Sequence, residues 1–307
     1  LGGAALLGPR HAERELLMLH ERFRAMGTSM ELLLDAPETP AARSALAAAR
    51  REIERLEGLL SRFRPDSELS RLNRDRRMRI GPDLRRVLAA ALRLRRSTGG
   101  RFDPTVGRAV VAAGYDRSFD LMDGDPGPAG APVPSGGLVV LDDAWGWAGL
   151  GDGVDLDLGA IAKGDAADRA CAVLAEAGPC LVNAGGDLVV SGPRVDGPWP
   201  VGLDAAGGGV VLNLESGAMA TSGTDRRRWT RGGRSMHHAI EPRRGTCAGT
   251  DLVRATAVAA TGAEADALAT ALLVAGSGEA RHLAEMWHVP AALVDESGEL
   301  TLVGGLR

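Results

Sequence analysis

The segment that most constrains the fold is residues 263–275, AEADALATALLVA, which is apolar on nearly every side. A helix without a polar face has to be buried, so this segment must pack inside a core formed by other elements. Apart from Glu264 in its first turn, it carries two polar residues, Asp266 and Thr270, and a spacing of one turn places them on the same helix face. The fold therefore has to bury a carboxylate and a hydroxyl side by side.

A buried carboxylate needs a counter-charge or a metal ion, because an ionised Asp is costly in an apolar environment. A carboxylate and a hydroxyl oxygen at i and i+4 are suitable ligands for Mg²⁺, which prefers hard oxygen donors. The alternative is structural: Asp266 caps another helix, and Thr270 bonds its own i−4 carbonyl. The segment alone leaves both interpretations open.

The rest of the chain predicts an α+β fold. Apolar residues spaced three and four apart predict an amphipathic helix that begins at Thr39-Pro40 and runs to Leu60. Short strands joined by turns, with helices inserted irregularly, favour α+β over a doubly wound parallel sheet. The further helices are expected near residues 82–99, 160–177 and 279–288, and the strands near residues 30–35, 181, 201, 210, 238 and 253, with two more at the end.

Residues 121–137 contain nine Gly or Pro among 17 positions, too many for a regular element. They predict a long surface loop, or a joint between two lobes of one domain that spans residues 1–307.

The composition excludes several classes of protein. The 36 basic and 40 acidic residues give a net charge of −4 without a long block of like charge, which argues against nucleic-acid binding. No apolar run reaches the 18 or so residues of a transmembrane helix. The cysteines are odd in number and lack C-x-x-C spacing, so neither a disulfide framework nor a zinc site is expected at Cys171, Cys180 and Cys247.

The start of the chain carries neither an intact signal peptide nor a lipobox Cys, which favours a cytoplasmic location. The chain does not begin with Met, however, so an upstream export segment could have been removed and the location stays open.

A second motif, VDLDLGAIAKGDAAD, spans residues 154–168. Asp155 and Asp157 alternate with apolar residues as in a strand, and the chain then turns through Gly159 into a helix. A helix N-terminus favours anions such as phosphate, and Lys163, the only lysine of the chain, adds a point charge there. An Asp-capped strand-to-helix turn is the structural alternative.

Two further motifs contain glycines that let a backbone approach a ligand closely, although plain tight turns are equally compatible. The first is NAGGD, residues 183–187, and the second is the Ser222-Gly223 pair of ATSGTDRRRW. The following MHHAIEPRRG supplies adjacent histidines at 237 and 238. These point to opposite faces in a strand, so at most one of them faces a site.

Together and in this order, the motifs resemble those of the FAD:protein FMN transferase family, of the ApbE type. The similarity runs over most of the chain, in nine collinear motifs. They are FRAMGTSMEL (23–32), LSRFRPDSELSRLN (60–73), GGRFDPTVG (99–107), GYDR (114–117), DLGAIAKG (157–164), NAGGD (183–187), ATSGTDRRRW (220–229), HHAIEPRRG (237–245) and ADALATALLVAG (265–276).

The resemblance implies a T-fold-like, two-lobed α+β body with antiparallel sheets flanked by helices around a flavin cleft. It also implies that Mg²⁺ lies on the pyrophosphate of FAD, and that FMN is transferred to a Thr or Ser hydroxyl of an acceptor protein with release of AMP. Acceptors of the family carry the motif D-x-x-[ST]-G-A-[ST].

The resemblance assigns roles to residues of this chain by their positions in the matching motifs. Asp266, Thr270 and the Ala160 carbonyl are the expected metal ligands, and His238 is the expected catalytic residue. The expected cofactor-binding residues are Met26, Phe63, Arg101, Phe102, Asp103, Asp157, Lys163, Asn183, Gly185, Gly186, Asp187, Ser222, Gly223 and Ile240.

The chain departs from the family pattern at three positions. Phe63 replaces a Tyr, Glu241 replaces the Asp before Pro242, and Asp165 stands where relatives often have Tyr. Glu241 and Asp165 are expected to weaken adenine or flavin contacts. Besides the transferase, two alternatives remain. The same metal and pyrophosphate site would suit an Mg²⁺-dependent FAD pyrophosphatase that gives FMN and AMP, and the departures at Glu241 and Asp165 would suit a flavin-binding protein without turnover.

Overall fold

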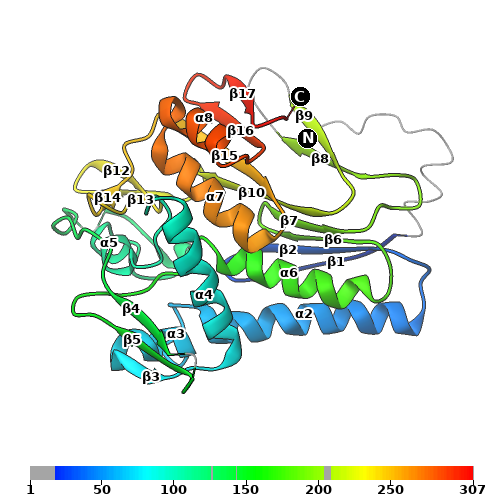
Figure 1. Ribbon diagram of the computed structural model, residues 1–307, viewed down its shortest axis with the longest axis horizontal. Helices are drawn as coiled ribbons and strands as arrows, with labels where there is room; N and C mark the ends of the chain where they lie inside the picture. The colour runs from blue at the N-terminus through cyan, green and yellow to red at the C-terminus, as the bar shows by residue number, and fades with distance from the viewer. Residues whose placement is uncertain (1–17, 126, 143, 204–208, 307) are drawn as a thin grey trace.

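The computed structural model describes residues 18–125, 127–142, 144–203 and 209–306, and an eight-stranded antiparallel sheet forms its centre (Figure 1). The strand order is β1-β2-β6-β7-β10-β15-β16-β17. The pairing of β2 with β6 joins the two halves of the chain in one sheet. The strands are Met18–Ala25 (β1), Thr28–Asp35 (β2), Cys180–Ala184 (β6), Asp187–Ser191 (β7), Gly217–Gly223 (β10), Leu252–Ala259 (β15), Ala291–Asp295 (β16) and Leu300–Val303 (β17).

Helices cover one face of this sheet, which confirms the α+β prediction (Figure 1). The helices α2 and α6 pack side by side, α7 lies against β10 and β15, α4 packs on α7, and α8 contacts β16 and β17. The helices of the described residues are Pro40–Leu60 (α2), Glu68–Asp75 (α3), Pro82–Ser97 (α4), Gly107–Ala112 (α5), Ala162–Ala175 (α6), Gly262–Ala275 (α7) and Ser277–Met286 (α8), with a 3₁₀ turn at Phe119–Leu121 (η1).

The long helix α2 begins and ends as its sequence predicts. Thr39 accepts a hydrogen bond from the Ala42 N–H at 3.1 Å, and Pro40 occupies the first turn, where its missing N–H costs nothing. Its buried stripe runs from Leu46 through Ile53 to Leu60 and packs into the main core. The predicted α6 and α8 are also confirmed, with ends that differ from the expected ones by a few residues.

Helix α7 is buried on almost all sides, in agreement with its sequence. Thr261 caps its N-terminus, and apart from Glu264, Thr270 and the terminal Ala275 every residue of the helix is buried. It therefore belongs to two hydrophobic cores, one shared with α2 and α6 and the other with α8 and β15.

The contact between α6 and α7 depends on two glycines that face each other. A Cβ added to Gly164 would lie 2.1 Å from the Gly262 carbonyl oxygen, and one added to Gly262 would lie 2.6 Å from the Gly164 oxygen. Such distances exclude any side chain, so the backbones of the two helices touch directly. This contact brings Lys163 on α6 close to Asp266 on α7.

We expect Gly164→Ala to lower the free energy of unfolding by about 1–3 kcal/mol, because the added methyl group forces the two backbones apart. Gly58→Ala is the matched control, since a Cβ at this position of α2 meets nothing within 4 Å. The control should leave stability unchanged or raise it by up to about 1 kcal/mol. Urea unfolding of both variants measures the difference, and equal stabilities would contradict the direct backbone contact.

A separate hairpin covers the other face of the central sheet. Its strands are Trp199–Leu203 (β8) and Val210–Leu214 (β9). Trp199, Val201 and Leu212 pack there against Leu188 and Met219 of the central sheet. Residues of β6, β7 and β10 therefore alternate between two packed layers.

Three small sheets complete the fold. They are β3-β5-β4, with strands Arg77–Arg79, Trp147–Leu150 and Val139–Asp142, β11-β12, with strands Arg228–Arg231 and Arg234–His237, and β13-β14, with strands Ile240–Glu241 and Thr246–Cys247. The strand expected around His238 thus ends at His237.

The strand expected through Asp155 and Asp157 is wrong. This segment forms only an isolated parallel bridge between Val106 and Asp155. The side chain of Asn73 takes the place of a neighbouring strand, because its amide donates to the Leu156 carbonyl at 2.9 Å and its oxygen accepts from the Leu156 N–H at 2.8 Å. The alternating polarity at Asp155 and Asp157 therefore belongs to an extended segment that the Asn73 side chain holds in place.

The described part of the Gly- and Pro-rich stretch, residues 121–125 and 127–137, contains no helix or strand beyond the last residue of η1. Its backbone bonds to both halves of the chain, with Gly130 N–H donating to Ala112 and Ser135 N–H donating to Pro242. Its role as a joint between lobes stays a prediction. Within the described ranges, no helix is both long and apolar enough to cross a membrane.

Candidate active site

One cavity of about 870 Å³ opens where the β1–β2 turn, the N-terminus of α6, the β6–β7 turn and the side of α7 meet. Its volume lies in the upper part of the range of about 300–1,000 Å³ that is typical of small-molecule sites. All the residues that the sequence predicts for the site line this cavity: Met26, Phe63, Arg101, Phe102, Asp103, Asp157, Ala160, Lys163, Asn183, Gly185, Gly186, Asp187, Ser222, Gly223, His238, Ile240, Asp266 and Thr270. Their individual roles stay predictions.

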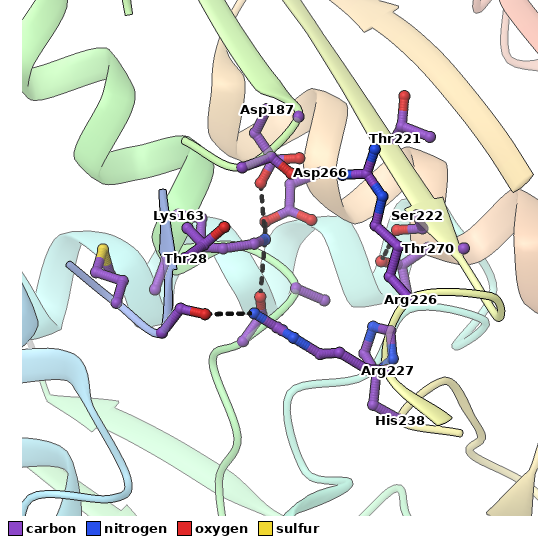
Figure 2. Close-up of a pocket in the computed structure, with 18 of the residues that line it drawn as sticks. Thr28, Lys163, Asp187, Thr221, Ser222, Arg226, Arg227, His238, Asp266 and Thr270 are labelled. Carbon is purple, nitrogen blue, oxygen red and sulfur yellow. Dashed lines mark hydrogen bonds and ion pairs between the residues drawn. The ribbon is translucent and has the colours of Figure 1, made fainter. Parts of the chain in front are cut away.

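At the centre of the cavity, Lys163 lies between two buried carboxylates (Figure 2). Its Nζ is 2.7 Å from Asp187 Oδ2 and 2.9 Å from Asp266 Oδ2, and it also donates to the Gly159 carbonyl at 3.2 Å. Three elements supply these groups, since Lys163 is in the first turn of α6, Asp187 begins β7 and Asp266 is on α7. The solitary lysine is therefore the centre of an ion-pair cluster.

The pKa values in this cluster show a surplus of negative charge. Burial alone would lower the pKa of Lys163, but Asp187 and Asp266 outweigh it and hold that pKa above its ordinary value. Burial, followed by the nearby charge of Asp187, raises the pKa of Asp266 to about 7. When both carboxylates are ionised, one ammonium does not neutralise them, so a further cation at this place would be stabilised.

The oxygens around Asp266 fit a hard divalent cation. Thr270 lies one turn further along α7, where its hydroxyl is 2.8 Å from the Ser222 hydroxyl. Ala160 lines the same cavity, and its carbonyl accepts no hydrogen bond from any described residue. Within the described residues, no three His, Cys, Asp or Glu side chains converge as a metal site. A bound ion would therefore also use hydroxyl, carbonyl and substrate oxygens, as Mg²⁺ commonly does.

His238 faces the cavity, whereas His237 faces away from it. His237 Nε2 bonds to the Ala248 carbonyl at 3.1 Å, which accounts for that side chain structurally. Of the two His238 ring nitrogens only Nδ1 is fully buried without a hydrogen-bond partner, so Nε2 is the one that a ligand reaches. Burial, assisted by the positive charges of Arg227 and Lys163, lowers the pKa of His238 to about 3. The ring is therefore neutral at pH 7.

Aromatic rings and an arginine form one wall of the cavity. The Arg62 guanidinium lies 4.1 Å from the ring centroid of Phe63 and 4.8 Å from that of Tyr115, and these two rings are 5.4 Å apart. An ion pair of 2.6 Å between Arg62 and Asp157 fixes the arginine. Phe63 is still 38% exposed, so it offers a ring face to a planar ligand.

Two tight turns form another part of the cavity lining. Met26 and Gly27 both have left-handed backbones, with φ values of 52° and 68°, as a two-residue turn between β1 and β2 requires. Gly185 in the β6–β7 turn lies so close that an added Cβ would be 2.1 Å from Thr28 Oγ1. The glycines of NAGGD thus allow two turns to approach each other beside the lysine cluster.

Comparison with known proteins shows which family the chain belongs to. The ApbE family model matches residues 26–294. The chain belongs to the ApbE family. A relative from Rhodobacter capsulatus, named FAD:protein FMN transferase, is 32% identical over 309 residues, which cover 94% of this chain and 57% of the relative. A Haemophilus influenzae protein of the same name is 28% identical over 266 residues, 76% of this chain and 73% of that protein.

Solved structures support the same assignment. The crystal structure of the ApbE protein from Thermotoga maritima has a TM-score of 0.82 at 26% identity and covers 93% of this chain and 97% of its own. The flavinyl transferase ApbE of Pseudomonas stutzeri, solved in an apo form, has a TM-score of 0.78 at 25% identity, with coverage of 93% and 95%. The fold of this ApbE family member is thus shared over nearly its whole length.

Some predicted residues of this ApbE chain are committed to structural contacts. Asp103 is buried, pairs with Arg95 at 3.0 Å and accepts hydrogen bonds from the Thr105 N–H and hydroxyl. Arg101 pairs with Glu279 of α8. The Asn183 side-chain oxygen accepts from the Gly186 N–H at 2.8 Å and so shapes the β6–β7 turn. These contacts hold the cavity wall in place. If these three residues also contact a ligand, they do so in addition to their structural hydrogen bonds and ion pairs.

Two departures from the ApbE pattern lie outside the cavity lining. Asp165 is buried, and its carboxylate pairs with Arg86 on α4. Glu241 belongs to the β13–β14 hairpin, where its side chain accepts from the Arg243 N–H at 3.1 Å. Neither side chain lines the cavity, so the weakened flavin or adenine contacts expected from these substitutions have no basis in the structure.

Several residues that line the cavity are not among those that the sequence predicts. Among them are Thr28, Arg62, Tyr115, Arg226 and Arg227. Arg62 lies within a matching motif, and Tyr115 is the only tyrosine of the chain, so both gave a signal. Arg226 and Arg227 also lie within a matching motif, residues 220–229, but Arg is so frequent in this chain that the residue type alone gives little signal.

Proposed function

We propose that the chain transfers FMN from FAD to a Ser or Thr hydroxyl of an acceptor protein, with release of AMP and in the presence of Mg²⁺. One observation carries the proposal. A neutral histidine, a surplus of buried carboxylate and an exposed aromatic face open into the same large cavity. The names of the relatives, FAD:protein FMN transferase, supply the substrates.

The residues of the chain divide the work of phosphoryl transfer. The acceptor oxygen forms a bond to the FMN phosphorus, and the bond from that phosphorus to the bridging oxygen breaks, so the bridging oxygen leaves with AMP. His238 Nε2 takes the hydroxyl proton, for which the ring has to be neutral. Asp266, Thr270 and the Ala160 carbonyl would hold Mg²⁺, which supplies charge neutralisation at the phosphates when bound.

The pKa of about 3 makes His238 a weak base in the free protein. Arg227 and Lys163 contribute to this low value, and a bound pyrophosphate would offset their positive charges. We therefore infer that the basicity of His238 rises when FAD binds. Substrate binding thereby moves its pKa toward the range in which general bases are efficient.

The same geometry supports a second activity. A water molecule in the position of the acceptor hydroxyl would release FMN and AMP, because His238 can take a proton from either nucleophile. The hypothesis of a flavin-binding protein without turnover rested on Glu241 and Asp165. Neither residue lines the cavity, so the structure gives that hypothesis no support. The pyrophosphatase is thus the alternative that an experiment has to separate from the transferase.

The decisive experiment incubates the protein with FAD and Mg²⁺, with and without a small acceptor that carries D-x-x-[ST]-G-A-[ST]. AMP is followed by chromatography and the acceptor by mass spectrometry. AMP together with an FMN-sized mass gain supports the transferase, and an acceptor with its hydroxyl residue changed to Ala is the control. AMP without a mass gain supports the pyrophosphatase, and neither product contradicts both.

The raised pKa of Asp266 predicts how metal binding depends on pH. Below about pH 7 the metal-free carboxyl holds a proton, which a metal ion has to displace. Mg²⁺ affinity should therefore be full above pH 7 and fall about tenfold for each pH unit below it. Isothermal titration between pH 5.5 and 8.5 measures this slope. A Glu264→Gln control, on the same helix but outside the cavity, should keep it, and a flat profile in the unchanged protein would contradict the prediction.

A further inference from the structure

Most positive charges around the cavity have an acidic partner. Among the described lining residues, each Lys or Arg except two forms an ion pair within 4.0 Å. The exceptions are Arg226 and Arg227, in the segment between β10 and β11. The cavity thus holds two guanidinium groups that form no ion pair within 4.0 Å with a described carboxylate.

The protein contacts of these two guanidinium groups are few and long. Arg226 Nη1 donates to the Gly185 carbonyl and Arg227 Nη2 to the Gly27 carbonyl, each at 3.5 Å, the outer limit of a hydrogen bond. A guanidinium has five N–H donors in a planar fork. Most of the hydrogen-bonding capacity of both groups therefore remains for a ligand.

The backbone that carries Arg227 is fixed on both sides. Before it, the Thr224 N–H donates to Val253, and Asp225 accepts two hydrogen bonds from Arg254 at 3.0 and 2.7 Å. After it, the Trp229 indole donates to the Ala113 carbonyl at 2.9 Å. Arg227 is half-buried, whereas Arg226 and Arg228 are exposed. Its side chain is thus held in the cavity rather than in solvent.

The Arg227 side chain points towards the β1–β2 turn, where its Nη2 donates to the Gly27 carbonyl (Figure 2). Its charge contributes to the lowered pKa of His238 and acts on Asp266 as well. The guanidinium is therefore close to both the proposed base and the proposed metal ligand. That is the place where a phosphate group has to lie if those residues act on it.

We propose that Arg227 binds the pyrophosphate of FAD and positions the phosphorus that is attacked. The inference rests on the proposed function. The pyrophosphate carries two negative charges at neutral pH, and a planar guanidinium matches phosphate oxygens with two parallel hydrogen bonds. The carboxylates around Lys163 repel an anion. Arg227 therefore supplies an attraction that a metal ion alone would otherwise have to provide.

The test compares ligands with and without phosphate in protein treated with EDTA, so that binding is measured without turnover. Arg227→Gln should weaken FAD and ADP by about 10- to 100-fold, the loss expected for a charge-assisted contact. Its affinity for riboflavin, which has no phosphate, should stay within about twofold. Arg228→Gln is the matched control, since this neighbour does not line the cavity, and it should bind all three ligands as the unchanged protein does.

Flavin fluorescence measures FAD and riboflavin, and ADP is measured by competition. Arg227→Lys keeps the charge but not the fork, so it should recover part of the FAD affinity, which a merely structural role would not predict. Equal FAD affinity in Arg227→Gln and the unchanged protein would overturn the inference, as would an equal loss of riboflavin. The proposed function fails separately, when the unchanged protein binds FAD but yields neither AMP nor a modified acceptor.

Discussion

Replacing Asp266 by Asn should reduce FMN transfer by about a thousandfold or more, because the variant loses the only carboxylate among the predicted metal ligands. Asn keeps the size of the side chain and leaves Lys163 paired with Asp187, so α7 should stay folded. Transfer is measured as acceptor mass gain per minute at saturating FAD and Mg²⁺. Metal affinity should fall in parallel, which isothermal titration shows independently of turnover.

Glu264→Gln is the control for this variant. It removes a carboxylate from the first turn of the same helix without touching the cavity lining. Its transfer rate should stay within about twofold of the unchanged protein, with a loss of stability of about 0.3–1 kcal/mol from the helix dipole. Undiminished transfer by a folded Asp266→Asn protein would show that the metal, if bound, uses other ligands.

The sequence predicted best those features that depend on local pattern. Helix α7 and its Asp266–Thr270 pair followed from a period of 3.6 residues and an apolar surface, and α2 followed from its cap, its proline and its stripe. The site residues were found largely because their motifs resemble a family. Their convergence on one cavity depends on long-range strand pairing, such as that of β2 with β6, which no local pattern specifies.

The features that the sequence did not predict correctly have one physical cause. They depend on contacts between residues that are far apart in the sequence. The alternating polarity around Asp155 predicts a strand, but the structure has an extended segment that is held by hydrogen bonds between Asn73 and Leu156, 83 positions apart. Arg227 was missed because its value lies in the absence of a carboxylate partner among the described residues, which only the folded cavity reveals. The family pattern predicts an effect of Asp165 and Glu241 on ligand contacts, but Asp165 pairs with Arg86, Glu241 accepts from the Arg243 N–H, and neither residue lines the cavity.

Replacing His238 by Ala should lower the turnover number for FMN transfer by 10²- to 10⁴-fold, the usual contribution of a general base. FAD affinity should change only a few-fold, because the ring takes a proton in the reaction and contributes little to binding. His237→Gln is the control from the adjacent position. It should lower thermal stability through the lost bond to Ala248 and keep the turnover number. Added imidazole should restore part of the activity of His238→Ala. An unchanged turnover number in His238→Ala would show that another group accepts the hydroxyl proton and that His238 only lines the cavity.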